Sequence, residues 1–339
     1  MSETKWNKER IRNKTLLIVE GNHEKDKFIT RLLEAFPEIN IDIDNVIVFK
    51  TNIYILLSKI QNEYGDDWYE QDINLPLLIS EEMENDIKYD KRDFTDIFLI
   101  FDYERHDPNF TEDGILRMQM YFSNSEDVGK LYLNYPMIES YMDLDNIVDF
   151  NYSNKKVSTN VRNGNEYKIS VKNKIVSKLI YFPIKIKSIM IEKFGVEYLT
   201  AENCVKMLLS ETDIVKAINN MKRMIGNAIH ESSLKTLMRQ TEFMILDYGF
   251  MENGFNYNTY MRYVFSQITI QNVKKSNFIQ NGKYEIPNEL LKHTYHEIDP
   301  TEILKQQNLI SSPDGSHEVF VLNTSIFMLP DYNTELVFS

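Results

Sequence analysis

Short apolar runs that alternate with helical patterns constrain the fold of this chain more than any other feature of its sequence. Runs rich in Val, Ile, Leu and Phe, each typical of a buried strand, occupy residues 15–20, 45–50, 96–101 and 130–134. Helical spacing of apolar residues follows at 23–36, 53–64 and 112–122. Apolar strands separated by helices predict a parallel sheet covered by helices on both faces. We therefore expect an α/β fold over residues 1–150.

The pattern changes after residue 150. Residues 152–165 are polar and rich in Asn, Ser and Lys, which predicts a loop. Beyond this loop, helical spacing of apolar residues recurs at 173–194, 201–209, 213–229, 232–247 and 258–274. We expect a second, mainly helical domain over residues 151–339 that binds nucleic acid or a partner protein. The apolar tail, residues 318–338, has no periodicity that decides between helix and strand.

Acidic side chains stand where three of the expected strands end. Glu20 ends the first strand, Asp102 and Glu104 follow the third, and Glu139 comes just after the fourth. Glu24 lies one helical turn beyond Glu20, so it can face the same side. In open parallel sheets, functional groups gather outside the carboxyl ends of the strands. We expect these five carboxylates to converge at one edge of the sheet.

Clustered carboxylates repel one another unless a cation lies between them or some are protonated. An all-oxygen set favours Mg²⁺ or Mn²⁺ over zinc. Two such ions can activate water and stabilise the leaving oxygen in phosphodiester cleavage. Structural interpretations also stand: Glu24 can favour the positive end of a helix, Glu104 can pair with Arg105, and Glu139 can be an ordinary acid of a first helical turn. Glu20 and Asp102 directly follow apolar strands, where a buried carboxylate without a role is costly.

The charges of the chain are unevenly distributed. The sequence has 51 acidic and 38 basic residues, a formal net charge of −13, which at first argues against a nucleic-acid partner. Residues 63–113 contain 17 acidic and 4 basic residues, whereas residues 155–193 contain 10 basic and 2 acidic ones. Solvated helix faces explain most single charge runs, but two opposite blocks also fit an acidic site that faces a basic binding surface. We predict that the basic stretch 155–193 contacts phosphate groups through Lys172, Lys174 and Lys178.

The order of the acids resembles that of the TOPRIM domain, which is found in topoisomerases, primases and some nucleases. The resemblance rests on the segment V-E-G, which contains Glu20, and on the later segment I-F-D-Y-E, which contains Asp102 and Glu104. More narrowly, Glu24 follows Glu20 by four residues and Glu139 follows the next strand, a pattern similar to that of the OLD-family TOPRIM nucleases.

This resemblance implies a nuclease that uses two Mg²⁺ or Mn²⁺ ions. Carried over by position, Glu20 is a metal ligand and general base, Asp102 and Glu104 are catalytic metal ligands, and Glu24 and Glu139 complete the ligand set. The match covers roughly residues 15–145. Two departures are the Glu at position 104, where the family usually has a second Asp, and the long acidic insertion over residues 65–93, for which we expect a helix at 77–85.

The family resemblance also implies a partner. OLD proteins usually fuse an ATPase to the nuclease, but no Gly-x-x-x-x-Gly-Lys-Ser/Thr sequence is present. The resemblance therefore implies a standalone nuclease subunit similar to the one that PARIS-like anti-phage systems pair with a separate ATPase. Two alternatives stay open: a catalytically idle TOPRIM-like regulatory or interaction subunit, and a small-molecule phosphohydrolase. A homodimer is a further open alternative.

The composition also indicates where the protein is located. Residues 1–14 are polar and charged, and no apolar run approaches the roughly 18 to 20 residues that span a bilayer. Cys204 is the only cysteine, which excludes an intrachain disulfide and a cysteine zinc cluster. We expect a cytoplasmic protein that makes no membrane contact.

Overall fold

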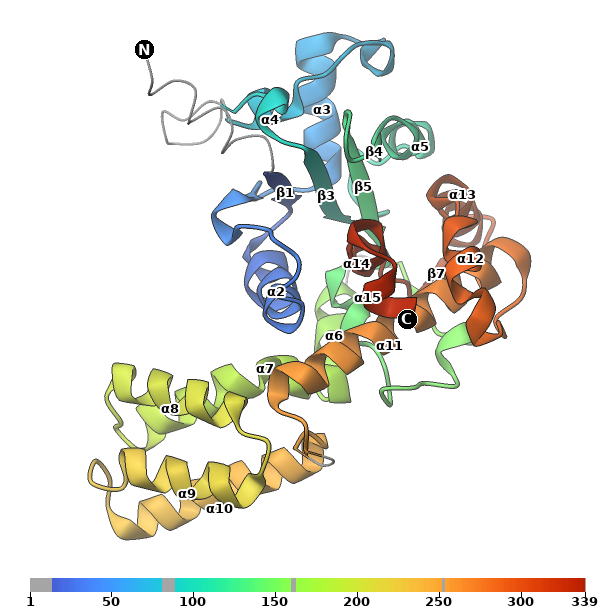
Figure 1. Ribbon diagram of the computed structural model, residues 1–339. Helices are drawn as coiled ribbons and strands as arrows, with labels where there is room; N and C mark the ends of the chain where they lie inside the picture. The colour runs from blue at the N-terminus through green and yellow to red at the C-terminus, as the bar shows by residue number, and fades with distance from the viewer. Residues whose placement is uncertain (1–13, 81–88, 160–162, 252–253, 339) are drawn as a thin grey trace, which may run out of the picture.

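A five-stranded sheet lies at the centre of the computed structural model, which describes residues 14–80, 89–159, 163–251 and 254–338 (Figure 1). The strand order is β2-β1-β3-β5-β4, with β4 antiparallel to β5 and the other neighbours parallel. The predicted α/β fold with a mostly parallel sheet is therefore confirmed. The strands are β1 (Thr15–Val19), β2 (Val46–Val48), β3 (Asp96–Asp102), β4 (Ser123–Asn124) and β5 (Gly129–Asn134).

Helices cover both faces of the sheet because successive strand residues point to opposite sides. Leu17 and Val19 pack with the π-helical segment η1 (Glu24–Ile29), α2 (Thr30–Ala35) and the long helix α11 (Tyr257–Asn281). Leu16 and Ile18 pack on the other face. The helices of that second face are α3 (Ile53–Tyr64), α5 (Glu112–Tyr121) and α13 (Pro300–Ser311).

The acidic insertion packs against α3 and α5. It contains α4 (Leu75–Ser80) and two 3₁₀ turns, Trp68–Glu70 and Lys91–Asp93. Trp68 is buried in the second-face core, which anchors the insertion. The helix expected at 77–85 lies partly outside the described residues, which omit 81–88.

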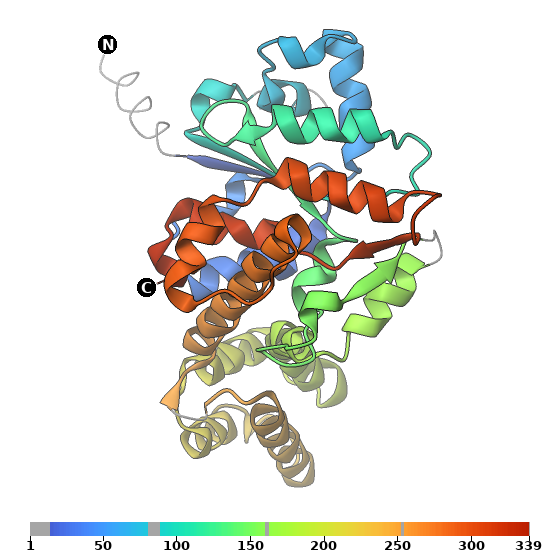
Figure 2. The same cartoon turned by 90° about the vertical axis from the view of Figure 1, so that its right-hand side faces the viewer.

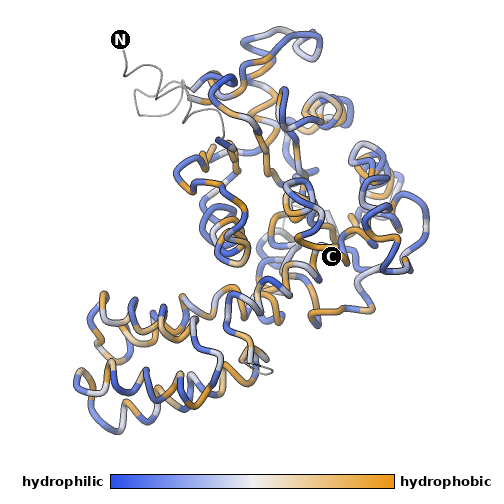
Figure 3. The backbone as a smooth tube through the Cα atoms, viewed as in Figure 1, coloured by the Kyte–Doolittle hydropathy of each residue, from blue (hydrophilic) through white to orange (hydrophobic). Residues whose placement is uncertain are grey.

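Four helices form a lobe beside the sheet, at the lower left of Figure 1. They correspond to the helices predicted from 173 to 247, and along them hydrophobic and hydrophilic residues alternate, as expected for helices with one buried face (Figure 3). The long helix α11 (Tyr257–Asn281) runs from this lobe to the sheet. The lobe consists of α7 (Ile175–Ser188), α8 (Tyr198–Ser210), α9 (Ile214–Ile225) and α10 (Glu231–Tyr248).

The last segment of the chain returns to the sheet. β7 (Glu318–Phe320) pairs antiparallel with β6 (Lys156–Ser158), as Figure 2 shows. Leu322 then bridges to Tyr135, just after β5. The short helices around this return are α12 (Leu291–His296), α14 (Met328–Tyr332) and α15 (Glu335–Phe338).

Residues 152–165 differ from the predicted loop. They include β6, and from Asn163 they enter α6 (Asn163–Val171). β6 could not be predicted because three residues are too few to show a strand periodicity. Its partner, β7, lies far along the chain, so no nearby segment indicates the pairing. The proposed domain division at 150 stays a prediction, and the buried core on the first face extends from β1 to the carboxyl-terminal helices. Among the described helices, none is long and apolar enough to cross a membrane.

Candidate active site at the carboxyl edge of the sheet

Three neighbouring strands, β1, β3 and β5, end at the edge where the acidic residues were expected. The backbone N–H of Glu20 donates to the carbonyl of Ile100 in β3 at 3.2 Å, which extends the pairing of the two strands by one residue. In turn, Oε2 of Glu20 accepts a hydrogen bond from the backbone N–H of Asp102 at 3.2 Å. The carboxylate of Glu20 therefore lies across the end of β3.

Asp102 links β3 to the segment after β5. Its Oδ1 accepts a hydrogen bond of 2.7 Å from the backbone N–H of Ile138, and its side chain is buried. Ile138 begins the 3₁₀ turn η5 (Ile138–Met142), which carries Glu139. Glu139 is 4% exposed, and its Oε2 is a buried atom without a hydrogen-bond partner among the described residues.

Glu24 is turned back towards the loop that follows β1. Its Oε2 accepts a hydrogen bond of 2.8 Å from the backbone N–H of Gly21, and its side chain is 5% exposed. A Cβ at position 21 would lie 3.1 Å from that same oxygen, so a larger residue there would displace the carboxylate by a few tenths of an ångström. The short segment from Glu20 to Glu24 thus places two carboxylates on one side of the sheet edge.

Burial and the charges of neighbouring acids raise the pKa values of Glu20, Glu24 and Asp102. Burial, followed by the charge of Glu104, raises the pKa of Glu20 to about 8. Burial and the charge of Glu20 raise the pKa of Asp102 well above its ordinary value, and burial together with Glu139 raises that of Glu24. Carboxylates in this state favour protonation or a nearby cation.

Lys168 of α6 provides a positive charge beside the acids. Its Nζ lies 3.4 Å from Oε1 of Glu139. Burial alone would lower the pKa of Lys168, but Glu139 and Asp102 outweigh that effect and raise it. His23 lies 3.9 Å from the same Oε1 atom, and burial lowers its pKa, so the imidazole is neutral near pH 7.

Glu104 stands apart from the other predicted ligands. Its Oε2 accepts a hydrogen bond of 3.1 Å from Nδ2 of Asn52, which also donates to Asp107 at 2.6 Å. The other end of the same amide caps α3, because Oδ1 of Asn52 accepts from the N–H of Ile55. Glu104 still acts on Glu20 through its charge, but its carboxylate is held towards α3.

The donor set fits Mg²⁺ or Mn²⁺ in its chemistry, since it consists of carboxylate oxygens and includes the unpartnered Oε2 of Glu139. The side chains are not arranged around one point. Within the described part of the chain, no group of three or more His, Cys, Asp or Glu side chains is placed to hold a metal ion. The structure thus brings Glu20, Glu24, Asp102 and Glu139 to one sheet edge without forming a complete ligand shell.

A cavity of about 940 Å³, the lysine cavity, opens beside Glu139 and His23. Its walls come from α6, α7 and the end of α10. Of the three lysines predicted to bind nucleic acid, Lys172 and Lys178 line it. The cavity lysines are Lys168, Lys172, Lys178 and Lys185.

The other predicted lysine lies elsewhere. Lys174 pairs with Asp145 and lies 3.9 Å from Oδ1 of Asp143, and it does not line the lysine cavity. Lys178 also has an acidic neighbour, since its Nζ lies 3.1 Å from Oδ2 of Asp247. The ammonium of Lys172 makes no ion pair with any residue that the structure describes, which leaves it the most available of the three.

The structure adds three residues to the site that the sequence did not single out: Lys168, Asn52 and His23. Asn52 directly precedes the helix expected from residue 53, and Asn is a favoured N-cap. The sequence could therefore have indicated that Asn52 begins this helix. Lys168 was one of ten basic residues in a stretch expected to be partly loop, so nothing distinguished it. Comparisons of the chain with protein-family models, curated proteins and solved structures gave no match.

Proposed function

We propose that this chain is a metal-dependent nuclease that hydrolyses phosphodiester bonds of DNA or RNA. One observation carries the proposal: buried or half-buried carboxylates from the ends of adjacent parallel strands face one another beside a lysine-lined cavity. Structural ion pairing does not account for Asp102 and Glu24, because both are buried and burial raises their pKa values. The resemblance of the acid order to OLD-family TOPRIM nucleases supplies the reaction type.

The residues of the chain would divide the work as follows. Glu20, Glu24, Asp102 and Glu139 would hold Mg²⁺ or Mn²⁺, and Glu104 would join them as the family resemblance implies. The same resemblance implies two ions. Bound ions of this kind supply Lewis acidity and a hydroxide-like water. Glu20, whose Oε2 lies across the end of β3, would accept a proton from the attacking water, a role that the family resemblance implies. Lys168 would face the phosphate from the side of Glu139.

The lysine cavity would hold the phosphate backbone of the substrate. Lys172 has no described acidic partner, and Lys178 shares its charge with Asp247, so Lys172 should contribute more to binding. Phosphate contacts of this kind weaken as the salt concentration rises. Lys174, which is paired with Asp145, should contribute least of the three predicted lysines.

The proposal is tested by incubating the purified chain with DNA and RNA in Mg²⁺ or Mn²⁺. The incubation is done with the chain alone and with the ATPase proposed as its partner. Cleavage by the unaltered chain should fall by roughly 100-fold or more in Glu20→Gln, because both a ligand and the base are lost. Glu126→Gln is the matched control, since Glu126 is exposed and lies away from the sheet edge. Failure of the unaltered chain to cut any nucleic acid, together with unchanged metal binding in Glu20→Gln, would overturn the proposal.

A second candidate is a catalytically idle regulatory or interaction subunit of an ATPase-containing complex. It is favoured by the ion pair of Lys168 with Glu139 and by the absence, among the described side chains, of a complete ligand set. Calorimetric titration with Mn²⁺ separates the two candidates. Binding that disappears in both Glu20→Gln and Asp102→Asn supports the nuclease, whereas no binding by the unaltered chain supports the idle subunit.

The proposed setting is anti-phage defence together with a separate ATPase partner, and its support is the family resemblance. Co-expression of the chain with a candidate ATPase in cells challenged with phage addresses it directly. Protection that requires both subunits and is lost in Glu20→Gln supports the setting. Protection that persists in Glu20→Gln would instead favour the idle subunit.

A further inference from the structure

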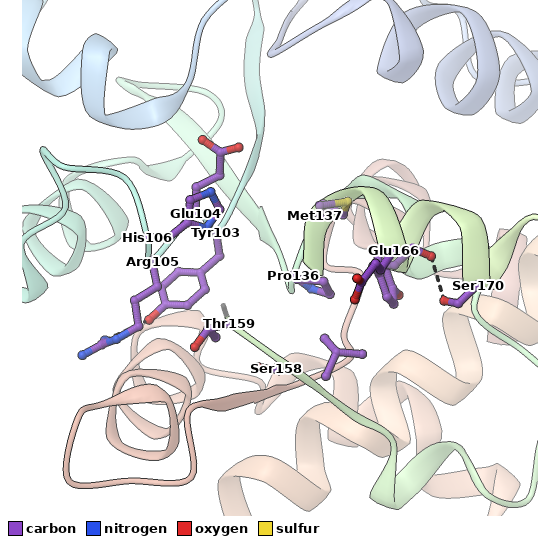
Figure 4. A pocket seen from close by; sticks show the side chains of 13 residues that line it. Tyr103, Glu104, Arg105, His106, Pro136, Met137, Ser158, Thr159, Glu166 and Ser170 are labelled. Atoms are coloured by element: carbon purple, nitrogen blue, oxygen red, sulfur yellow. Dashed lines mark hydrogen bonds between the residues drawn. The ribbon is translucent and has the colours of Figure 1, made fainter. Parts of the chain in front are cut away.

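A second cavity, the Glu104 cavity, lies on the other side of α6 from the lysine cavity. It measures about 260 Å³ and is bordered by Glu104 and His106 on one side and by α6 on the other (Figure 4). Cavities that enclose drug-sized ligands range from roughly 300 to 1,000 Å³. The Glu104 cavity therefore has room for one small group, such as a single base, next to a predicted catalytic residue.

The lining of this cavity does not suit a phosphate group. Among the described residues no lysine lines it, and its one arginine, Arg105, is already engaged. The guanidinium of Arg105 donates to Glu112 at 2.7 Å and to the hydroxyl of Tyr103 at 3.2 Å. It also lies 4.8 Å from the ring centroid of Phe110. The cavity thus suits an uncharged ligand, in contrast to the lysine cavity.

The walls of the Glu104 cavity are largely apolar. Pro136, Met137 and Val157 contribute aliphatic surface, and the buried rings of Tyr103 and Tyr167 complete the lining. Aliphatic and aromatic walls are the usual surroundings of a base that has been taken out of its stack. The cavity therefore matches a flat, mainly apolar group better than a sugar or a phosphate.

The carboxylate of Glu166 gives the cavity a chemical preference. The carboxylate of Glu166, on α6, points into the cavity opposite Glu104 and His106 (Figure 4). An ionised carboxylate only accepts hydrogen bonds, so it favours a ligand edge that presents donors and disfavours one that presents acceptors. Guanine is the base whose Watson–Crick edge offers two adjacent donors, N1–H and N2–H, to one carboxylate.

We propose that the Glu104 cavity binds a guanine base of the substrate beside the cleaved bond, with Glu166 accepting hydrogen bonds from N1–H and N2–H. This inference rests on the proposed nuclease function, which it deepens by naming a base preference. The lysine cavity then holds the phosphate backbone on one side of α6, and the Glu104 cavity reads a base on the other.

The experiment measures nucleoside binding to the full chain by saturation-transfer NMR, without metal. Guanosine, inosine, adenosine, cytidine and uridine are the probes. Guanosine should bind most tightly, and inosine, which lacks the N2 amino group, more weakly. Glu166→Gln should weaken guanosine binding roughly tenfold, because the amide presents one acceptor where the carboxylate presents two. Glu242→Gln, which changes an exposed glutamate on α10, is the matched control and should bind guanosine as the unaltered chain does.

A second variant guards against a merely structural effect. Ser170→Phe places a ring in the mouth of the cavity and should weaken all five nucleosides, while the thermal unfolding midpoint of each variant checks its folding. Equal binding of the five nucleosides, or unchanged guanosine binding in Glu166→Gln, would overturn the inference. Nucleic-acid cleavage is scored separately: cleavage without guanosine preference removes the base assignment alone, whereas absence of cleavage removes the nuclease proposal.

Discussion

The position of Glu20 in the fold strongly changes the pKa of its carboxyl group. It follows a fully buried strand, faces Glu24 and Glu104, and has a pKa of about 8 against an ordinary value of 4.5. The backbone N–H of Asp102 offsets only part of that effect. A residue held in this state weakens the fold near neutral pH, so its presence is better explained by chemistry than by stability.

The first prediction concerns pH. Above 4.5 the unfolded chain releases the Glu20 proton, whereas the folded chain keeps it up to about pH 8. The folded state therefore binds more protons in this window, and its stability falls as the pH rises through it. Without divalent cations, the thermal unfolding midpoint should decrease between about pH 5 and pH 8. Glu20→Gln should flatten this decrease and Glu126→Gln should not; parallel curves for all three proteins would contradict the assignment.

The second prediction concerns Lys168. Lys168→Met removes the positive charge beside Glu139 and should destabilise the metal-free protein by about 1 kcal/mol at pH 8. Lys172→Met, on the same side of the lysine cavity, should have a smaller effect because Lys172 has no described acidic partner. Thermal unfolding measures both. An equal loss at high salt concentration, where the attraction between the two charges is screened, would show that packing and not charge is responsible.

At the scale of elements, α11 connects the lobe to the sheet through a buried lysine. Lys275 is fully buried, and its Nζ donates to the carbonyls of Tyr152, Ser153 and Lys155 at 2.6, 2.5 and 3.0 Å. Burial lowers the pKa of Lys275 to about 7, while the three carbonyl acceptors favour its charged form. The helix thereby fixes the segment that leads from η5 into β6.

The third prediction follows from these bonds. Lys275→Met leaves three carbonyls without their donor and should lower the free energy of unfolding by about 2 kcal/mol or more. The neighbouring Lys274→Met, which removes a half-buried lysine with no such bonds, should cost much less. Urea denaturation compares the two variants. Similar losses in both would mean that the carbonyl contacts of Lys275 contribute little.

The elements also show how far sequence reasoning reaches. β1, β2, β3 and β5 were predictable because each contains an apolar run, whereas β4, two exposed polar residues, was not. Glu20 and Asp102 came together because parallel strands end at a common edge. β6 was not predictable, since three residues carry no period and their partner, β7, is distant in sequence. Spacing alone likewise could not show that Lys174 turns to Asp145 while Lys172 lines the cavity.

At the scale of the whole molecule, the carboxyl-terminal segment braces the site. Asn323 is fully buried, and its Nδ2 donates to the carbonyl of Ile138 at 3.0 Å and to Oγ of Ser140 at 3.2 Å. These residues flank Glu139 in η5. The backbone N–H of Asn323 also donates to Oδ1 of Asn272 in α11 at 2.8 Å. Asn323 thus joins the sheet edge, through its side chain, to the long helix, through its backbone N–H.

The fourth prediction tests this brace. Asn323→Ala should lower the free energy of unfolding by about 2 kcal/mol or more, because it leaves buried groups unpaired. Under the proposed function it should also weaken Mn²⁺ binding, since Glu139 loses its support. Asn333→Ala, near the end of α14, removes only a local contact and is the control. Calorimetry measures Mn²⁺ binding, and thermal unfolding measures stability. Intact Mn²⁺ binding in a destabilised Asn323→Ala protein would show that the contacts of Asn323 stabilise the fold but do not support the metal site.

The return of the tail has a consequence for biosynthesis. A chain emerging from the ribosome presents β1, β3, β5 and their acids long before β7 and Asn323 exist to hold η5 in place. If the chain cuts nucleic acid, its catalytic edge is completed only after β7 and Asn323 have been synthesised. A polypeptide abandoned by a stalled ribosome would then carry the acids without their brace, and the cell would be spared the activity of the fragment.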